Sequence, residues 1–208
     1  MHRITITATS ANRNREAWLA IRRQHLTATD WPKITGTSRW GDAFSVLDDK
    51  LDPGGDEDFK PSLPMRVGTA LEPLIIRSIQ KDWGPGKYLS QVFVSRKHLG
   101  FTPDLVLLET PDQWRLAEIK VSVKPWLGWV PPDYLDQVSF QATVLGIGQV
   151  QVIHLQLESW GEGLSLIRSG TLPADRLTAY NVEVDEVDRR RIERKAEKWW
   201  KAHINNDL

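Results

Sequence analysis

The sequence contains no cysteine, no long apolar run and no net charge. The lack of cysteine excludes disulfides, thiolate zinc sites and a cysteine nucleophile. It also suits a reducing cytosol. No apolar run approaches the roughly 18–20 residues that a membrane-spanning helix needs, and the N-terminal segment lacks the apolar region of a secretory signal. We therefore expect a cytoplasmic protein with no membrane attachment.

The charged residues balance, with 27 Lys and Arg against 27 Asp and Glu. A protein that only coats DNA is usually basic, so this balance argues against such a role. It does not exclude an enzyme whose acidic metal ligands offset a basic groove. The ten tryptophans indicate large apolar side chains for the core and for interfaces. Base stacking is the alternative role for some of them.

Hydrophobic periodicity predicts several helices and strands. The predicted helices span residues 15–24, 65–83, 131–145 and 184–203, with a further helix starting near residues 27–30. The predicted strands span residues 91–94, 105–108, 115–121 and 149–157, with a further strand at 164–168. Residues 52–64 are predicted to form a loop and 110–112 a turn. Pro73 must lie in the first turn of its helix or kink it. This order predicts an α/β (α+β) fold, with a central mixed β-sheet flanked by helices.

Two carboxylates and an ammonium group are expected to meet on neighbouring strands. Asp104 follows a proline at the start of one strand, and Glu118 and Lys120 stand two residues apart on the next. Residues two apart project from the same face of a strand, and a tight turn between the strands would bring Asp104 beside Glu118. Two nearby carboxylates repel each other unless a cation lies between them. Such oxygen ligands suit Mg²⁺ or Mn²⁺, which activates a bound water for phosphodiester hydrolysis.

These residues also have ordinary explanations. An Asp after a Pro is common at turns, and a Glu-x-Lys pair is often part of a solvated strand face. However, the apolar neighbours Leu116, Ile119 and Val121 indicate an interior strand, where an unpaired charge is costly. A third carboxylate, Glu72, lies on the helix predicted at 65–83. It either faces the same site or is an exposed helical glutamate.

The combination of Asp104, Glu118-x-Lys120 and the upstream Glu72 resembles the PD-(D/E)XK nuclease superfamily. Three further segments make the chain similar to the lambda-exonuclease-type (YqaJ-like) phage recombination nucleases. They are Trp18–Arg23 with Leu26–Asp30, Phe101–Asp104, and Tyr134–Val138 with Gln141. The resemblance runs from about Trp18 to Leu157. It departs from the family pattern at Thr29 and Thr102, which often are Ser, and at Leu105, which often is Gly.

The resemblance implies a role for each matching position. Asp104, Glu118 and the backbone carbonyl of Ile119 would bind Mg²⁺, with Mn²⁺ as an alternative. Lys120 would act on the nucleophilic water, and Glu72 would support the site. A pocket for the 5′-phosphate of a DNA end would be formed by Arg22, Thr29, Thr102 and Gln137. Guanidinium, hydroxyl and amide groups are suitable donors to a phosphate.

The resemblance further implies an exonuclease that degrades one strand of duplex DNA from a 5′-phosphorylated end, in the 5′→3′ direction. It implies a trimer that encloses DNA, a single-strand annealing protein as partner and a phage or prophage origin. Residues 1–208 would form a single nuclease domain with a PD-(D/E)XK-like core at about 15–170 and a C-terminal helix at about 184–204.

The sequence leaves two alternative functions open. One is a structure-specific or restriction-type endonuclease of the same fold, and the other is a non-catalytic module that binds DNA ends. The roles of Trp126 and Trp129, in the loop before the helix at 131–145, are also left open between DNA contact, subunit contact and packing.

Overall fold

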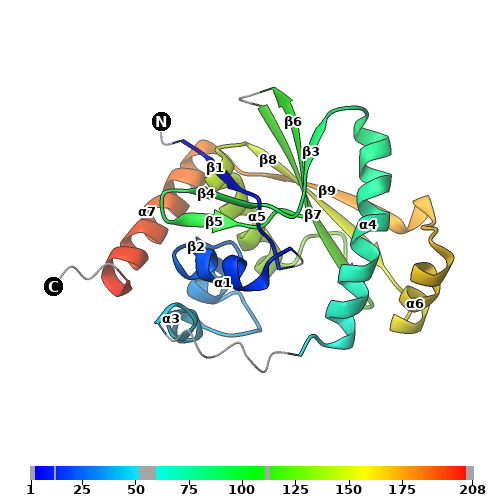
Figure 1. Ribbon diagram of the computed structural model, residues 1–208, viewed down its shortest axis with the longest axis horizontal. Coiled ribbons are helices and arrows are strands. Elements are labelled where there is room, and N and C mark those ends of the chain that lie inside the picture. Colours follow the sequence, from blue (N-terminus) through cyan, green and yellow to red (C-terminus); the bar gives the residue numbers. More distant parts are fainter. Residues whose placement is uncertain (1–2, 12, 52–59, 111–112, 205–208) are drawn as a thin grey trace.

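Two β-sheets form the centre of the molecule, with α4 and α6 on one side and α7 on the other (Figure 1). The computed structural model describes residues 3–11, 13–51, 60–110 and 113–204. The helices are α1 (Arg15–Arg23), α2 (Trp31–Thr35), α3 (Ala43–Leu51), α4 (Leu63–Trp83), α5 (Pro132–Leu145), α6 (Trp160–Ser169) and α7 (Glu186–His203). The strands are β1 (Thr5–Thr7), β2 (Leu26–Thr27), β3 (Lys87–Leu89), β4 (Phe93–Arg96), β5 (Leu99–Phe101), β6 (Leu105–Thr110), β7 (Gln113–Ser122), β8 (Gln149–Gln156) and β9 (Leu177–Glu183). The predicted fold class, a mixed sheet flanked by helices, is confirmed.

The larger sheet has the order β3-β6-β7-β8-β9, which puts β7 in the middle. Strand β6 pairs with β7 antiparallel, and β8 pairs with β7 parallel. Leu116 and Ala117 of β7 are fully buried on opposite faces of the sheet. Leu116 belongs to the core that includes α5, and Ala117 to the core that includes α4. Because both faces of the sheet are covered, the middle of β7 is mostly apolar, and Glu118 and Lys120 are its charged residues.

The register of β6 and β7 decides where the acidic residues meet. Leu105 lies opposite Ala117 in the antiparallel pair. The preceding residue, Asp104, therefore lies at the level of Glu118, at the end of β6. Glu118 and Lys120 share the face of Leu116, which is the face covered by α5.

The smaller sheet, of order β1-β4-β5-β2, was largely missed by the sequence analysis. Only β4 overlaps a predicted strand. Gly100 in β5 allows these short strands to pack closely, because a Cβ there would lie 2.4 Å from Cζ of Phe93. Strands β1 and β9 also lie outside residues 15–170, so the sheets extend beyond the predicted core.

Most of the long predicted elements are confirmed, namely α1, α4, α5, α7, β6, β7 and β8. The helix expected near residues 27–30 is α2, which follows Asp30. No helix in the described part of the chain is long and apolar enough to cross a membrane.

Two local predictions differ from the structure, and one of two alternatives for Pro73 is excluded. Residues 164–168 belong to helix α6 and not to a strand, since the Ser159 side chain caps this helix at Glu162 N–H. Helix α4 begins at Leu63, so the last two residues of the predicted loop at 52–64 are helical. Pro73 lies in the interior of α4, which excludes the first turn, one of its two predicted placements. Residues 52–59 of the loop and 111–112 of the predicted turn fall outside the described residues.

Candidate active site

Asp104, Glu118 and Lys120 converge at the α5-facing side of β7. The Asp104 carboxylate accepts a hydrogen bond from the Ile119 backbone N–H, with 2.6 Å between Oδ2 and N. The Lys120 ammonium donates to Glu118, with 2.7 Å between Nζ and Oε1. The expected proximity of the three side chains is therefore present. It results from the two-residue period of β7 and from the register of β6.

Two glutamines of α5 hold the Glu118 carboxylate from the other side. Gln137 donates to Oε1 at 2.5 Å, and Gln141 donates to Oε2 at 2.7 Å. These glutamines are one helical turn apart, so both amides project toward the sheet. Gln137 also accepts a hydrogen bond from Lys120 at 3.0 Å. Glu118 is buried, and each of its carboxylate oxygens accepts a hydrogen bond from a side chain.

The local electrostatics show an excess of negative charge. Burial raises the pKa of Asp104, and the neighbouring Glu118 and Glu72 carboxylates raise it further, to well above its usual range. Burial and the Glu118 charge also raise the pKa of Glu72. Glu72 therefore lies within electrostatic reach of the cluster from helix α4, with its carboxylate accepting a long hydrogen bond from Gln91.

Lys120 is the cation within this cluster. Burial alone would lower the pKa of Lys120, but Glu118 and Asp104 raise it above the usual value. The raised pKa favours the protonated side chain, which donates to Glu118 and Gln137. Its Nζ also lies 4.6 Å from the centre of the Tyr134 ring, a cation–π contact that helps to place the ammonium.

The donor set fits a hard divalent cation. The Asp104 and Glu118 carboxylates lie beside one ammonium, with Glu72 within electrostatic reach of both carboxylates. The raised pKa of Asp104 marks a repulsion that a cation would relieve. Carboxylate oxygens suit Mg²⁺, which keeps several waters and needs only one or two carboxylates. Among the residues that the structure describes, no three His, Asp or Glu side chains are grouped so that together they would hold a metal ion. The fit therefore rests on the Asp104 and Glu118 pair.

Three of the four residues predicted to bind a 5′-phosphate lie together. Arg22 donates to the Thr29 hydroxyl at 3.2 Å, and the Trp18 indole N–H donates to the Thr102 hydroxyl at 2.9 Å. The Arg22 guanidinium lies over the Trp18 ring at 4.6 Å, so Trp18 joins the two pairs. Thr102 is two residues before Asp104, which puts this group next to the acidic cluster.

Gln137, the fourth predicted phosphate-pocket residue, is placed differently. Its amide bonds to Glu118 and Lys120, and no hydrogen bond in the described structure links it to Arg22, Thr29 or Thr102. It therefore belongs to the carboxylate cluster. Trp18 and Gln141 lie in the motif segments, but no function was predicted for either residue. In the sequence, the spacing of one helical turn between Gln137 and Gln141 indicates that both side chains project from the same face of the helix.

Residues 17–147, more than half of the chain, match the family model of the YqaJ-like viral recombinase domain. The chain belongs to this family. Among curated proteins, none matches this chain.

The fold of this YqaJ-family chain is shared with solved exonuclease structures. One is the alkaline exonuclease LHK-Exo from Laribacter hongkongensis, with 18% identity, coverage of 90% of this chain and 91% of that one, and a TM-score of 0.62. The complex of LHK-Exo with dAMP gives a TM-score of 0.65. A phage-related exonuclease from Haemophilus somnus 129PT has 14% identity, coverage of 91% and 100%, and a TM-score of 0.56. At these identities the likeness shows a common fold.

The structure distinguishes the two tryptophans of the loop between β7 and α5. Trp126 stacks on His154 with ring centres 4.0 Å apart and planes at 4°, and it also packs against Tyr134 and Tyr180. It therefore packs between α5, which carries Tyr134, and strands β8 and β9, which carry His154 and Tyr180. Trp129 is 64% exposed and is available for contacts outside the chain.

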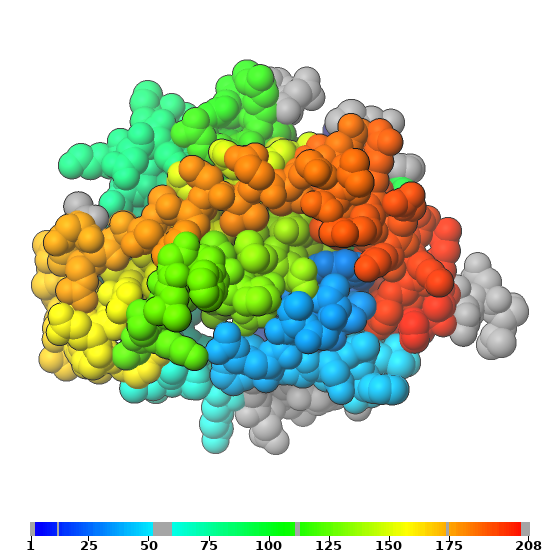
Figure 2. All heavy atoms as spheres, turned by 180° about the vertical axis from the view of Figure 1, so that it is seen from behind, coloured from blue at the N-terminus to red at the C-terminus, as the bar shows by residue number. Residues whose placement is uncertain are grey.

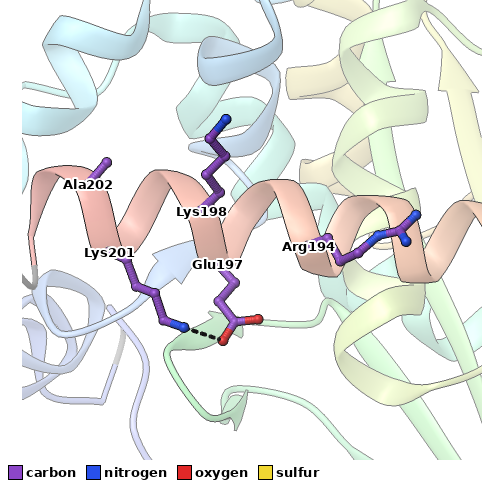
Figure 3. Close-up of a pocket in the computed structure, with 5 residues that line it drawn as sticks. All are labelled: Arg194, Glu197, Lys198, Lys201 and Ala202. Carbon is purple, nitrogen blue, oxygen red and sulfur yellow. Dashed lines mark ion pairs between the residues drawn. The ribbon is translucent and has the colours of Figure 1, made fainter.

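A surface pocket lies elsewhere in this YqaJ-family chain, along helix α7 (Figure 3). Its lining residues are Arg194, Glu197, Lys198, Lys201 and Ala202. Lys201 pairs with Glu197 at 3.0 Å, as i,i+4 residues on a solvated helix commonly do. None of the predicted site residues lines this pocket, and we assign it no catalytic role.

Proposed function

We propose that this YqaJ-family protein is a metal-dependent deoxyribonuclease that degrades one strand of duplex DNA from a 5′-phosphorylated end, in the 5′→3′ direction. The observation that carries the proposal is the convergence of Asp104, Glu118 and Lys120, with Glu118 clamped by two glutamines. A further support is that proteins of the same fold are exonucleases, one of them solved with dAMP.

Asp104, Glu118 and the carbonyl of Ile119 would hold Mg²⁺, with Mn²⁺ as an alternative. The bound ion would supply Lewis-acid polarisation of the phosphoryl group and a lowered pKa for its water. Lys120 is protonated, so its part is to orient the water and to offset negative charge that develops on the phosphoryl oxygens. Glu72 would add negative potential and receive a hydrogen bond from metal-bound water.

The 5′ end would be recognised by the group that lies beside the cluster. Arg22 offers a charged fork to the phosphate, and the Thr102 hydroxyl offers a donor. The Thr29 hydroxyl would orient the Arg22 guanidinium, from which it accepts a hydrogen bond. Gln137 would act from within the cluster, where it contacts Lys120 and Glu118. A pocket that holds the terminal phosphate next to the metal would leave the first phosphodiester bond at the reacting position, which is the basis for the 5′→3′ direction.

The assembly and cellular role are proposed from the family resemblance. We infer a homotrimer that encloses the duplex, a role in phage-type recombination with a single-strand annealing protein, and a site of action in the cytoplasm of a bacterial host. Exposed apolar side chains such as Trp40, Leu127 and Trp129 offer surface for such contacts.

The direct test compares linear 5′-phosphorylated duplex DNA with closed circular DNA in the presence of Mg²⁺. The wild type should degrade only the linear DNA. Lys120→Ala should reduce the rate by about 100-fold or more, since it removes a donor aimed at developing charge. The matched control is Lys81→Ala, an exposed lysine on α4, which should keep the wild-type rate.

The same test separates the rival functions. Cleavage of closed circles would replace the exonuclease with an endonuclease of the same fold. Binding of DNA ends without cleavage in Mg²⁺ or Mn²⁺ would leave a non-catalytic end-binding module.

A further inference from the structure

A buried ion pair lies behind the group that contains Arg22 and Thr29. Lys50 of α3 pairs with Asp30 at 2.8 Å, and their side chains are 0% and 3% exposed. Moving both charges out of water is costly, so a buried ion pair needs further hydrogen bonds that offset the lost hydration. The Lys50 ammonium also donates to the Arg22 backbone carbonyl at 3.1 Å and to the Asp49 carboxylate at 3.4 Å. Its three protons are thereby all used.

The Asp30 carboxylate leads on to the hydroxyl of Thr29. Oδ2 of Asp30 accepts from the Thr27 backbone N–H at 2.9 Å and from the Thr27 hydroxyl at 2.7 Å. The Thr27 and Thr29 hydroxyls are 3.1 Å apart. Because Thr27 spends its one proton on Asp30, it must accept the proton of Thr29.

Arg22 closes the ring. Its side chain donates to the Thr29 hydroxyl at 3.2 Å, while its backbone carbonyl accepts from Lys50. The contacts thus run from Lys50 through Asp30, Thr27 and Thr29 to Arg22 and back to Lys50. Every hydroxyl in the ring has a defined direction, and both Arg22 and Thr29 are fixed from behind.

Asp30 remains ionised within this ring. Burial would raise the pKa of Asp30, but Lys50 and Arg22 outweigh this effect and lower it below its usual value. Arg22 is therefore the next cation available to Asp30 after Lys50. Without Lys50, the buried carboxylate would attract the Arg22 guanidinium, in competition with a DNA phosphate.

We propose that Lys50 is a positioning residue that sets the preference for 5′-phosphorylated ends, by neutralising Asp30 and holding the backbone of Arg22. This inference rests on the proposed function of Arg22 as a phosphate ligand, with Thr29 orienting its guanidinium. Lys50 itself touches no substrate. It lies 28 residues from Arg22 along the chain, on a different helix.

The test measures binding of two duplexes that differ only in a 5′-phosphate or a 5′-hydroxyl, by fluorescence anisotropy with Ca²⁺ in place of Mg²⁺. The wild type should prefer the phosphorylated end. Lys50→Met should reduce that preference by about 10-fold or more, with little change for the hydroxyl end, because displaced ligating groups lose most of their effect. The exposed Lys81→Met on α4 is the matched control and should keep the wild-type preference.

A second variant keeps the test decisive if Lys50→Met does not fold. Thr27→Val is nearly isosteric, leaves the ion pair in place and breaks the relay between Asp30 and Thr29. It should also reduce the phosphate preference, by several-fold.

Other results would overturn the proposal. It fails if the folded variants keep the wild-type preference, or if both ends lose affinity equally, which would indicate a structural role only. If the wild type itself does not distinguish the two ends, the phosphate pocket of the proposed function fails, and this inference fails with it.

Discussion

Ionisation of the Asp104 carboxyl group is costly in the folded protein, because this partly buried group lies beside Glu118 and Glu72. Its raised pKa means that the folded protein binds this proton more tightly than the unfolded chain does. The cost therefore grows as the pH rises above the ordinary aspartate range and is complete above the raised pKa. Functional sites commonly reduce the stability of the folded protein when no ligand is bound.

Asp104→Asn should therefore stabilise the metal-free protein at pH 8, by about 0.5–2 kcal/mol, while abolishing activity. The asparagine oxygen can still accept from the Ile119 N–H, so the fold should be kept. The measurement is urea unfolding in EDTA at pH 8 and pH 4, where the gain should shrink at the lower pH. A variant less stable than the wild type at pH 8 would contradict this account of the charges.

His154 gives a second prediction from a single residue. Burial lowers its pKa to about 4, and its ring accepts or donates one hydrogen bond with Ser122 at 2.9 Å. The unfolded chain takes up the proton near the ordinary histidine pKa of about 6.5. Stability from this residue is thus fully present above that pH and is lost as the pH falls toward about 4.

His154→Phe keeps an aromatic ring against Trp126 but has no proton to bind. We expect its free energy of unfolding to fall less steeply than that of the wild type between pH 6.5 and pH 4. Denaturant unfolding at several pH values in this range measures the difference. Equal slopes would show that His154 does not titrate as its burial requires.

At the scale of elements, the sequence predicted long segments well and short ones poorly. Helices α4, α5 and α7 and strand β7 span enough residues for their periodicity to be unambiguous. Strands β1, β2 and β5 have only two or three residues, which is too few for an alternating pattern. Residues 164–168 are an apolar-rich stretch that fits either periodicity, and only the cap at Ser159 identifies the helix.

The same limit applies to the candidate site. Glu118, Lys120 and Asp104 could be grouped from strand spacing and a turn, which are local signals. The Gln141 contact with Glu118 depends on how α5 docks on the sheet, and the Lys50 contact with Arg22 depends on how α3 docks on α1. Such tertiary contacts are not encoded in local periodicity.

Helix α5 carries a prediction of its own, because Gln141 projects from it into the core with 1% exposure. Gln141→Leu removes the donor to Oε2 of Glu118 and should weaken metal affinity by roughly 10- to 100-fold, as loss of a group that orients a ligand commonly does. Calorimetry with Mn²⁺ on the DNA-free protein would measure this effect. The rate at saturating metal should change less, and an unchanged affinity would show that Gln141 only fills space.

At the scale of the whole molecule, polar contacts join the end of α2 and the segment after it to helix α5. Arg39 pairs with Asp133 at 3.6 Å, and the Thr35 and Thr37 hydroxyls bond to Asp136, which fixes the segment after α2 against α5. Figure 2 shows this segment and the loop between β7 and α5 on one face of the molecule. Trp40 and Trp129, which are 77% and 64% exposed, stand in these two segments, near the end of α5 that carries Gln137.

The overall neutrality of the chain is consistent with this arrangement. The carboxylates of Glu72, Asp104 and Glu118 lie in one cluster with the Lys120 ammonium, and Arg22 lies in the group beside that cluster. A DNA end would therefore meet local positive charge next to the acidic metal-binding groups, although the net charge is zero.

The most direct test of the central claim is release of the 5′-terminal nucleotide from a duplex with one labelled 5′-phosphorylated strand, followed in a single turnover. The account predicts a labelled mononucleotide in Mg²⁺, and none in EDTA or with Asp104→Asn. Release at the wild-type rate in EDTA, or no release in Mg²⁺ or Mn²⁺ from ends that are bound, would contradict it.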